Sequence, residues 1–197
     1  MFSQNVSSSI SEETLIELCK RGDYEKVRKF YKPDKVRVLF IGFNPPKNRF
    51  FYCRNSVLYY AVFSAFSSVL NVSERDFLGF FKKSGCYLYD LFPEERVGLK
   101  KIKKKIKRRE INVELAVKRL AKFLKEEKDN LRNIIVCFSL KNNRNAELKE
   151  CIVKALKEVR FNIELEFFPF PGTSLNFARA VEELEKIISA KKYLFEV

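Results

Sequence analysis

Residues 36–46 read Val-Arg-Val-Leu-Phe-Ile-Gly-Phe-Asn-Pro-Pro, and this stretch decides the fold class. Its first six residues are apolar except for Arg37, a pattern that favours a central parallel strand covered on both faces. The glycine and the two prolines that follow cannot continue a strand. We therefore expect a strand over 36–41 whose carboxyl end presents an amide, Asn44, on a stiff turn.

Strands and helices are predicted to alternate along the rest of the chain. Residues 85–92 and 133–138 are apolar runs of strand length, and 161–167 alternates apolar with polar residues, which predicts a half-buried edge strand. Apolar residues recur at helical spacing over 55–70, over 113–124 and in the last segment, which carries Phe177, Val181, Leu184 and Ile188. Serine caps and the break at Gly22-Asp23 predict helices near 11–20 and 24–31, and further helices are expected after Ser73 and near 144–159.

This order predicts right-handed crossovers and a three-layer α/β/α sandwich around a short, mainly parallel four-stranded sheet. Residues 1–35 are predicted to form a helical extension packed on the core, and 36–197 the α/β domain. A length of 197 residues with 46% apolar composition suits one such unit.

The chain is strongly basic, with 39 Lys and Arg against 25 Asp and Glu and a net charge of +14. Such an excess of one sign predicts a polyanionic partner, DNA in our interpretation. The densest stretch is 100–109, where eight of ten residues are basic: Lys100, Lys101, Lys103, Lys104, Lys105, Lys107, Arg108 and Arg109. Ile102 and Ile106 are four apart and can attach this stretch to the body as a helix. The alternatives are a solvated charge run and a heat-adapted, ion-rich surface.

The chain has no histidine, and its five cysteines form no Cys-x-x-Cys pair. We expect buried free thiols in a reducing compartment, no metal and no cofactor. Any catalysis must then use carboxylates, amides, hydroxyls or water. Residues 1–9 are polar and no run of 18 apolar residues occurs, so we expect an intracellular protein without a membrane partner, cytoplasmic, or nuclear in a eukaryote.

Ligands of open α/β sheets bind where the carboxyl ends of strands meet the following loops, here 42–54, 90–95 and 169–174. Asn44 can position a water, and the rings of residues 50–52 can stack on a planar base. Asp90 can act as a general base or as an electrostatic partner for a cationic sugar. The alternatives are that Asn44 caps a turn, that the rings fill the core and that Asp90 is a solvated strand-end carboxylate.

Residues 42–46, Gly-Phe-Asn-Pro-Pro, resemble the Gly-Ile-Asn-Pro-Gly motif of the mismatch-specific uracil/thymine-DNA glycosylases, a branch of the uracil-DNA glycosylase superfamily. Residues 51–59 resemble the family's continuation, in which a base-stacking aromatic precedes Asn-Arg-Phe-Trp and a helix. Gly85-Cys86 is similar to the start of its next strand. Residues 168–176 are similar to its second motif, Pro-Asn-Pro-Ser-Gly-Leu, so the resemblance spans roughly 36–190.

The resemblance implies a monomeric, monofunctional DNA repair glycosylase that flips a base out of DNA and needs no cofactor. Asn44 would hold the water that attacks C1′, and Phe51 or Tyr52 would stack on the base. Gly42, Phe43, Asn55 and Phe170 would complete the base site. DNA contacts would come from the basic stretch and from Lys47, Arg49, Arg54, Pro171, Gly172, Thr173 and Ser174.

Phe170 stands where the superfamily has His or Asn, and its ring cannot donate a hydrogen bond to uracil. Two alternative hypotheses follow. The chain can be a non-catalytic DNA-binding member of the same fold, or an unrelated α/β nucleotide-binding enzyme with a coincidental Asn-Pro-Pro turn.

Overall fold

The computed structural model describes residues 11–94, 99–107, 112–137 and 146–196. Within these residues, strands pair in parallel in the order β2-β1-β3-β4. Their bounds are Val38–Gly42 (β1), Cys86–Asp90 (β2), Asn133–Val136 (β3) and Leu165–Phe167 (β4). The expected α/β class and parallel sheet are confirmed.

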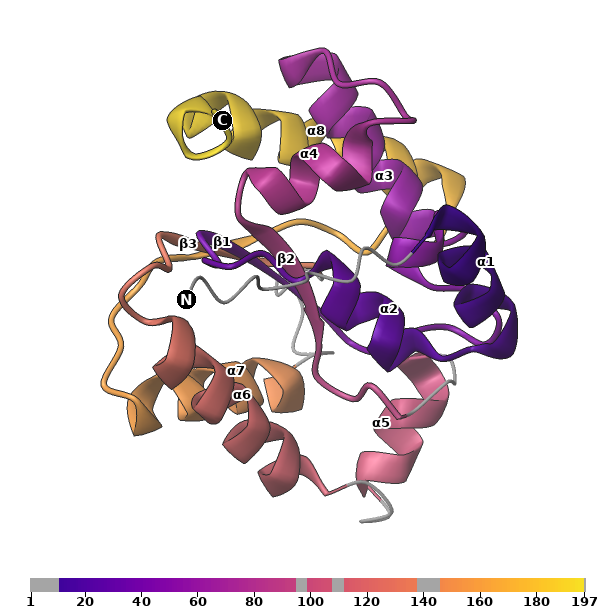
Figure 1. The fold of residues 1–197 in the computed structure, drawn as a ribbon. Coiled ribbons are helices and arrows are strands. Elements are labelled where there is room, and N and C mark those ends of the chain that lie inside the picture. Colours follow the sequence, from indigo (N-terminus) through magenta and orange to yellow (C-terminus); the bar gives the residue numbers. More distant parts are fainter. Residues whose placement is uncertain (1–10, 95–98, 108–111, 138–145, 197) are drawn as a thin grey trace, which may run out of the picture.

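Helices cover both faces of this sheet (Figure 1). Their bounds are Glu12–Arg21 (α1), Tyr24–Tyr31 (α2), Val57–Leu70 (α3), Phe77–Lys83 (α4), Leu99–Lys107 (α5), Val113–Glu127 (α6), Ala146–Glu158 (α7) and Ser174–Ala190 (α8), with short 3-10 turns at Phe51–Cys53 (η1) and Lys192–Leu194 (η3). Helices α3, α4 and α8 lie on one face, and α6 and α7 pack together on the other. Each helix matches a segment that was expected to be helical from its caps, its chain breakers or its apolar spacing.

The strand order explains the burial of β1, β3 and β4. Every residue of β1 and β3 is buried, because both strands are central, whereas all three residues of β4 are half-buried at the edge. The prediction of an edge strand is therefore confirmed, but its length was wrong. β4 begins only at Leu165, because the short β3 offers it partners over no more than Ile134–Val136.

The N-terminal helices pack against the core through α2. Ser11 caps α1 by accepting a hydrogen bond from the Thr14 N–H at 3.2 Å. Helix α2 buries Tyr24, Val27 and Arg28. Residues 11–31 thus contribute directly to the packed interior.

The expectation of five free thiols was wrong for two of them. Cys19 of α1 and Cys53 of η1 form a disulfide across 34 residues of sequence. Cys86, Cys137 and Cys151 are free and buried, as expected. The scattered spacing that argued against a metal site does not exclude a disulfide, because two thiols can meet once α1 folds back on the loop after β1. The reducing compartment inferred from free thiols loses this support.

Within the described ranges, no helix combines the length and the apolar composition needed to cross a lipid bilayer.

Candidate functional site

A cavity of about 290 Å³ lies at the carboxyl ends of the central strands. The turn after β1 and the turn after β4 both line it, although more than 120 positions separate them in the sequence. Among the predicted site residues, the cavity brings together Gly42, Phe43, Asn44, Arg49, Phe51, Asp90, Phe170 and Gly172. Its walls are mainly apolar.

Asn44 is half-buried at the cavity wall, on a turn that the β1–β2 pairing extends. The N–H groups of Leu91 and Phe92 donate to the carbonyls of Gly42 and Phe43 at 3.1 and 2.8 Å, so the chain after β1 remains registered with β2. The Asn44 amide donates to the Pro45 carbonyl at 3.3 Å. This backbone fixes where the amide stands relative to the end of β2.

Asp90 ends β2 on the same wall, and it is not the solvated carboxylate of the alternative interpretation. Its side chain is 5% exposed, and Oδ2 accepts a hydrogen bond from the Arg28 guanidinium at 2.6 Å. Burial raises the pKa of Asp90, while the charge of Arg28 and its hydrogen bond oppose that rise. A paired carboxylate therefore faces the cavity.

Gly42 is required by the close approach of this carboxylate. A Cβ on Gly42 would lie 2.9 Å from Asp90 Oδ1, closer than van der Waals contact allows. We expect Gly42→Ala to displace the carboxylate and to lower the free energy of unfolding by about 1–3 kcal/mol. Urea denaturation at neutral pH measures this change.

Gly79, inside α4, offers a matched control, since a Cβ there would meet nothing within 4 Å. Gly79→Ala should stabilise the protein by about 0.5–1 kcal/mol, because alanine loses less backbone entropy in a helix. Equal effects of the two substitutions would rule out the predicted crowding at Asp90.

The predicted stacking residues Phe51 and Tyr52 have different surroundings. Phe51 is buried and lines the cavity. Tyr52 does not line it: its ring stacks on Tyr31 at 5.2 Å and its hydroxyl accepts a hydrogen bond from the Leu88 N–H at 2.7 Å, so of the two alternatives the geometry favours Phe51. Phe50, one position earlier, lines the cavity instead.

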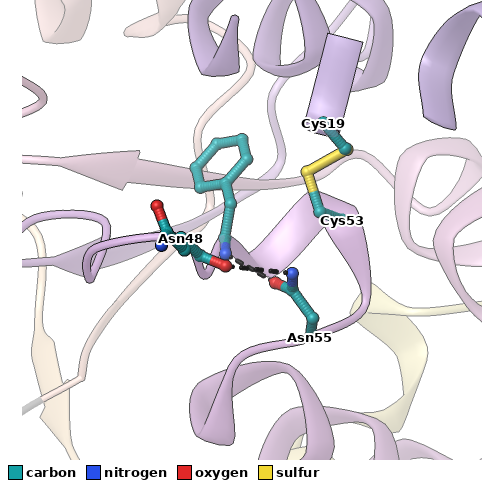
Figure 2. The surroundings of a disulfide bond; sticks show 5 residues. Cys19, Asn48, Cys53 and Asn55 are labelled. Atoms are coloured by element: carbon teal, nitrogen blue, oxygen red, sulfur yellow. Dashed lines mark hydrogen bonds between the residues drawn. A yellow bond between two sulfur atoms is a disulfide. The ribbon is translucent and has the colours of Figure 1, made fainter. Parts of the chain in front are cut away.

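Asn55 was also predicted to contact the base, but in the structure its side chain forms hydrogen bonds to the backbone of the loop after β1. Its Oδ1 accepts from the Phe50 N–H at 2.7 Å, and its Nδ2 donates to the Asn48 carbonyl at 3.3 Å. Figure 2 shows these two hydrogen bonds beside the Cys19–Cys53 disulfide. Asn48 has a positive φ of 59°, so the loop makes a tight turn that Asn55 closes. Asn55 therefore shapes the loop and is exposed outside the cavity.

The turn after β4 supplies an aromatic ring to the opposite wall. Phe170 is 39% exposed and lines the cavity together with Gly172. The Phe170 ring lies 3.1 Å from the position of a Cβ on Gly172, so glycine permits the ring to fold back over the turn. Pro171 is buried, and Thr173 caps α8 by accepting from the Asn176 N–H at 3.3 Å. Thr173 and Ser174 are exposed and outside the cavity.

The start of α3 is a part of the wall that sequence reasoning missed. Ser56, Val57 and Leu58 line the cavity, and the Ser56 hydroxyl caps the helix by accepting from the Tyr59 N–H at 3.1 Å. The positive end of a 14-residue helix therefore meets the cavity. The Asn-Ser pair before an apolar helix was the signal that could have identified it.

The basic residues are spread over several surfaces. Lys47 and Arg49 are exposed on the loop after β1, whereas Arg54 lines a separate open groove with Tyr31 and Arg75. In α5, Lys101, Lys104 and Lys107 are exposed. Ile106 packs against the core, as its spacing predicted. The side chains of Lys100, Ile102 and Lys103, and all of Arg108 and Arg109, lie outside the described residues.

No protein-family model, curated protein or solved structure matches this chain.

Proposed function

We propose that this protein is a monofunctional DNA glycosylase that hydrolyses the N-glycosidic bond of uracil, or of a related deaminated or mismatched base, held outside the duplex in the cavity beside Asn44. One observation carries the proposal: Asn44 from the turn after β1, Asp90 from the end of β2 and Phe170 from the turn after β4 line the same cavity. A carboxamide, a carboxylate and an aromatic ring together are suited to a nucleoside.

The size and walls of the cavity favour a single base as its occupant. Its volume of about 290 Å³ is at the small end of ligand sites. The rings of Phe50, Phe51 and Phe170 contribute to the walls. Stacking of a nucleobase on such rings is worth about 1–3 kcal/mol for each base.

Asn44 and Asp90 support hydrolysis at the sugar. In the reaction, the oxygen of a water attacks C1′, the C1′–N bond breaks, and its electron pair leaves with the base. The Asn44 amide can hold that water, and the carboxylate of Asp90 can accept its proton and balance the positive charge that develops on the sugar. No strong nucleophile is needed, because the transition state is already oxocarbenium-like.

The departing base carries negative charge, and Phe170 cannot stabilise it by a hydrogen bond. The start of α3 supplies what Phe170 lacks. Backbone N–H groups and the helix dipole at this end favour an anion. Residues 56–58 line the cavity, so we assign stabilisation of the leaving base to this helix terminus.

A panel of DNA duplexes tests this function. Duplexes containing uracil, hypoxanthine or a G·T mismatch are incubated with the protein, and alkali then cleaves any abasic site. We expect strand cleavage with at least one lesion. Tight duplex binding without cleavage of any lesion would contradict the glycosylase and support a non-catalytic DNA-binding protein.

DNA binding by α5 gives a separate prediction. Contact with about five phosphates gives a slope of about −4.5 for the logarithm of the binding constant against that of salt concentration. Replacing Lys101, Lys104 and Lys107 together with Gln should reduce the slope by about 1 for each lysine. Fluorescence anisotropy across a salt series measures it.

Lysines at the opposite end of the molecule serve as the matched control. The control residues are Lys125, Lys128 and Lys157, which are exposed near the carboxyl ends of α6 and α7. They lie at the end of the sheet where β3 and β4 begin. Their replacement by Gln removes the same charge and should leave the slope almost unchanged. Equal slopes for the two triple variants would show that α5 is not the DNA-binding helix.

A further inference from the structure

The carboxylate at the cavity wall is held by a residue from far away in the sequence. Arg28, in α2, is 62 positions from Asp90, and its guanidinium donates to Asp90 Oδ2 at 2.6 Å. Both side chains are almost fully buried, at 7% and 5% exposed. Removing two charges from water costs free energy, and an ion pair on the protein surface avoids this cost. A buried pair at this position is therefore unfavourable unless it serves a further role.

Further contacts fix the orientation of the guanidinium. Its NH1 group donates to Glu25 at 2.8 Å, within the same helix. Its central carbon lies 5.1 Å from the centre of the Phe50 ring, in a cation–π contact. Phe50 itself stacks on Tyr24 at 4.6 Å and lines the cavity. Glu25 and the Phe50 ring thus hold the Arg28 guanidinium in place, with its NH2 group directed at Asp90.

We propose that Arg28 is a positioning residue of the active site, and that it holds the Asp90 carboxylate in its charged form against the cavity. This inference rests on the function proposed above, in which Asp90 accepts a proton. Helix α2 then belongs to the active site, and the N-terminal helices are part of the catalytic unit.

The other titratable neighbours of Asp90 that the structure describes carry no positive charge that could stabilise its carboxylate. Tyr52 from η1, Tyr87 from β2 and Cys137 after β3 face the same buried region. Burial raises the pKa of each of these groups, so they are neutral at neutral pH. Among the described residues that act on Asp90, Arg28 is therefore the one that offsets the desolvation of its charge.

The sign of the expected pH effect follows. Without the cation, burial acts unopposed and the pKa of Asp90 rises further, so a larger fraction of the carboxyl is protonated near neutral pH. Arg28→Met should therefore lower the single-turnover rate of base release about tenfold or more at pH 6, and the deficit should shrink as pH rises. Arg28→Lys keeps a positive charge and should recover much of the activity at pH 6.

The experiment combines two readouts on the full chain. Carbon-13 NMR of labelled aspartate follows the titration of Asp90 without DNA, in the wild type, Arg28→Lys and Arg28→Met, with assignment by Asp90→Asn. Single-turnover base release is measured from pH 5.5 to 9. Glu25→Gln is the control, because it removes an exposed charge beside Arg28 while its amide oxygen can still accept the hydrogen bond from the guanidinium, and it should change neither readout.

Displacement of the Asp90 titration to higher pH in Arg28→Met, together with a pH-dependent loss of the single-turnover rate, supports the proposal. A folded Arg28→Met variant with unchanged Asp90 titration, or with the same loss of rate at every pH, overturns it. Should Arg28→Met fail to fold, Arg28→Lys decides: loss of activity that no pH restores contradicts the electrostatic role. Failure of the proposed function is distinguishable, since the wild type would then release no base while the NMR titration still reports on Arg28.

Discussion

Asn44→Ala is expected to lower the single-turnover rate of base release by about 10²- to 10³-fold, the loss typical of removing one placed polar group from a transition state. The side chain lines the cavity, and alanine can neither hold a water nor direct it at C1′. Binding of lesion DNA should change little, because the charged surfaces and aromatic walls remain. Rates are measured with enzyme in excess over a uracil-containing duplex.

Asn162→Ala is the matched control for this variant. Asn162 is exposed, just before the edge strand β4, and does not line the cavity. Its replacement removes the same amide and should leave the rate unchanged. Base release that is equally fast in Asn44→Ala would remove Asn44 from the mechanism.

Loss of the Cys19–Cys53 disulfide is expected to lower the free energy of unfolding by about 3–4 kcal/mol, because the bond closes a loop of 34 residues and so limits the entropy of the unfolded chain. The paired variant Cys19→Ala/Cys53→Ala tests this in urea denaturation under oxidising conditions. The bond joins α1 to η1, which carries Phe51 into the cavity, so base release should also be weakened.

Reductant separates the disulfide from other effects of the substitutions. It should destabilise the wild type to about the level of the paired variant and should leave the variant itself unaffected. Reductant that changes neither protein, with the two equally stable, would show that the bond does not form in solution.

The fold was largely predictable, because its elements are marked by local patterns. The apolar run at 36–41 and the prolines that follow located the central strand, although the strand begins at Val38 and includes Gly42. Caps, chain breakers and apolar spacing together located the helices. The length of β4 was not predictable in this way. Residues 161–164 have the alternation of a strand, but whether they pair depends on how far β3 extends beside them.

The site was predictable in its outline and less so in its details. The rule that ligands bind at carboxyl ends of parallel strands brought Asn44, Asp90 and Phe170 into one region. The positions of Tyr52 and Asn55 outside the cavity were not predictable, because their partners, Tyr31 and the backbone of residues 48 and 50, are set by tertiary packing. The Arg28–Asp90 pair joins residues 62 positions apart and has no sequence pattern.

A glycosylase must release a free base from the cavity beside Asn44, and detection of that base is the decisive experiment. The wild-type protein is incubated with the lesion duplexes, and released bases are identified by mass spectrometry alongside Asn44→Ala. We predict that at least one lesion base appears in amounts equal to the abasic sites formed, and that Asn44→Ala reduces its rate of appearance about 100-fold or more. Absence of any free base from every duplex, with DNA bound, would rule out the proposed glycosylase activity.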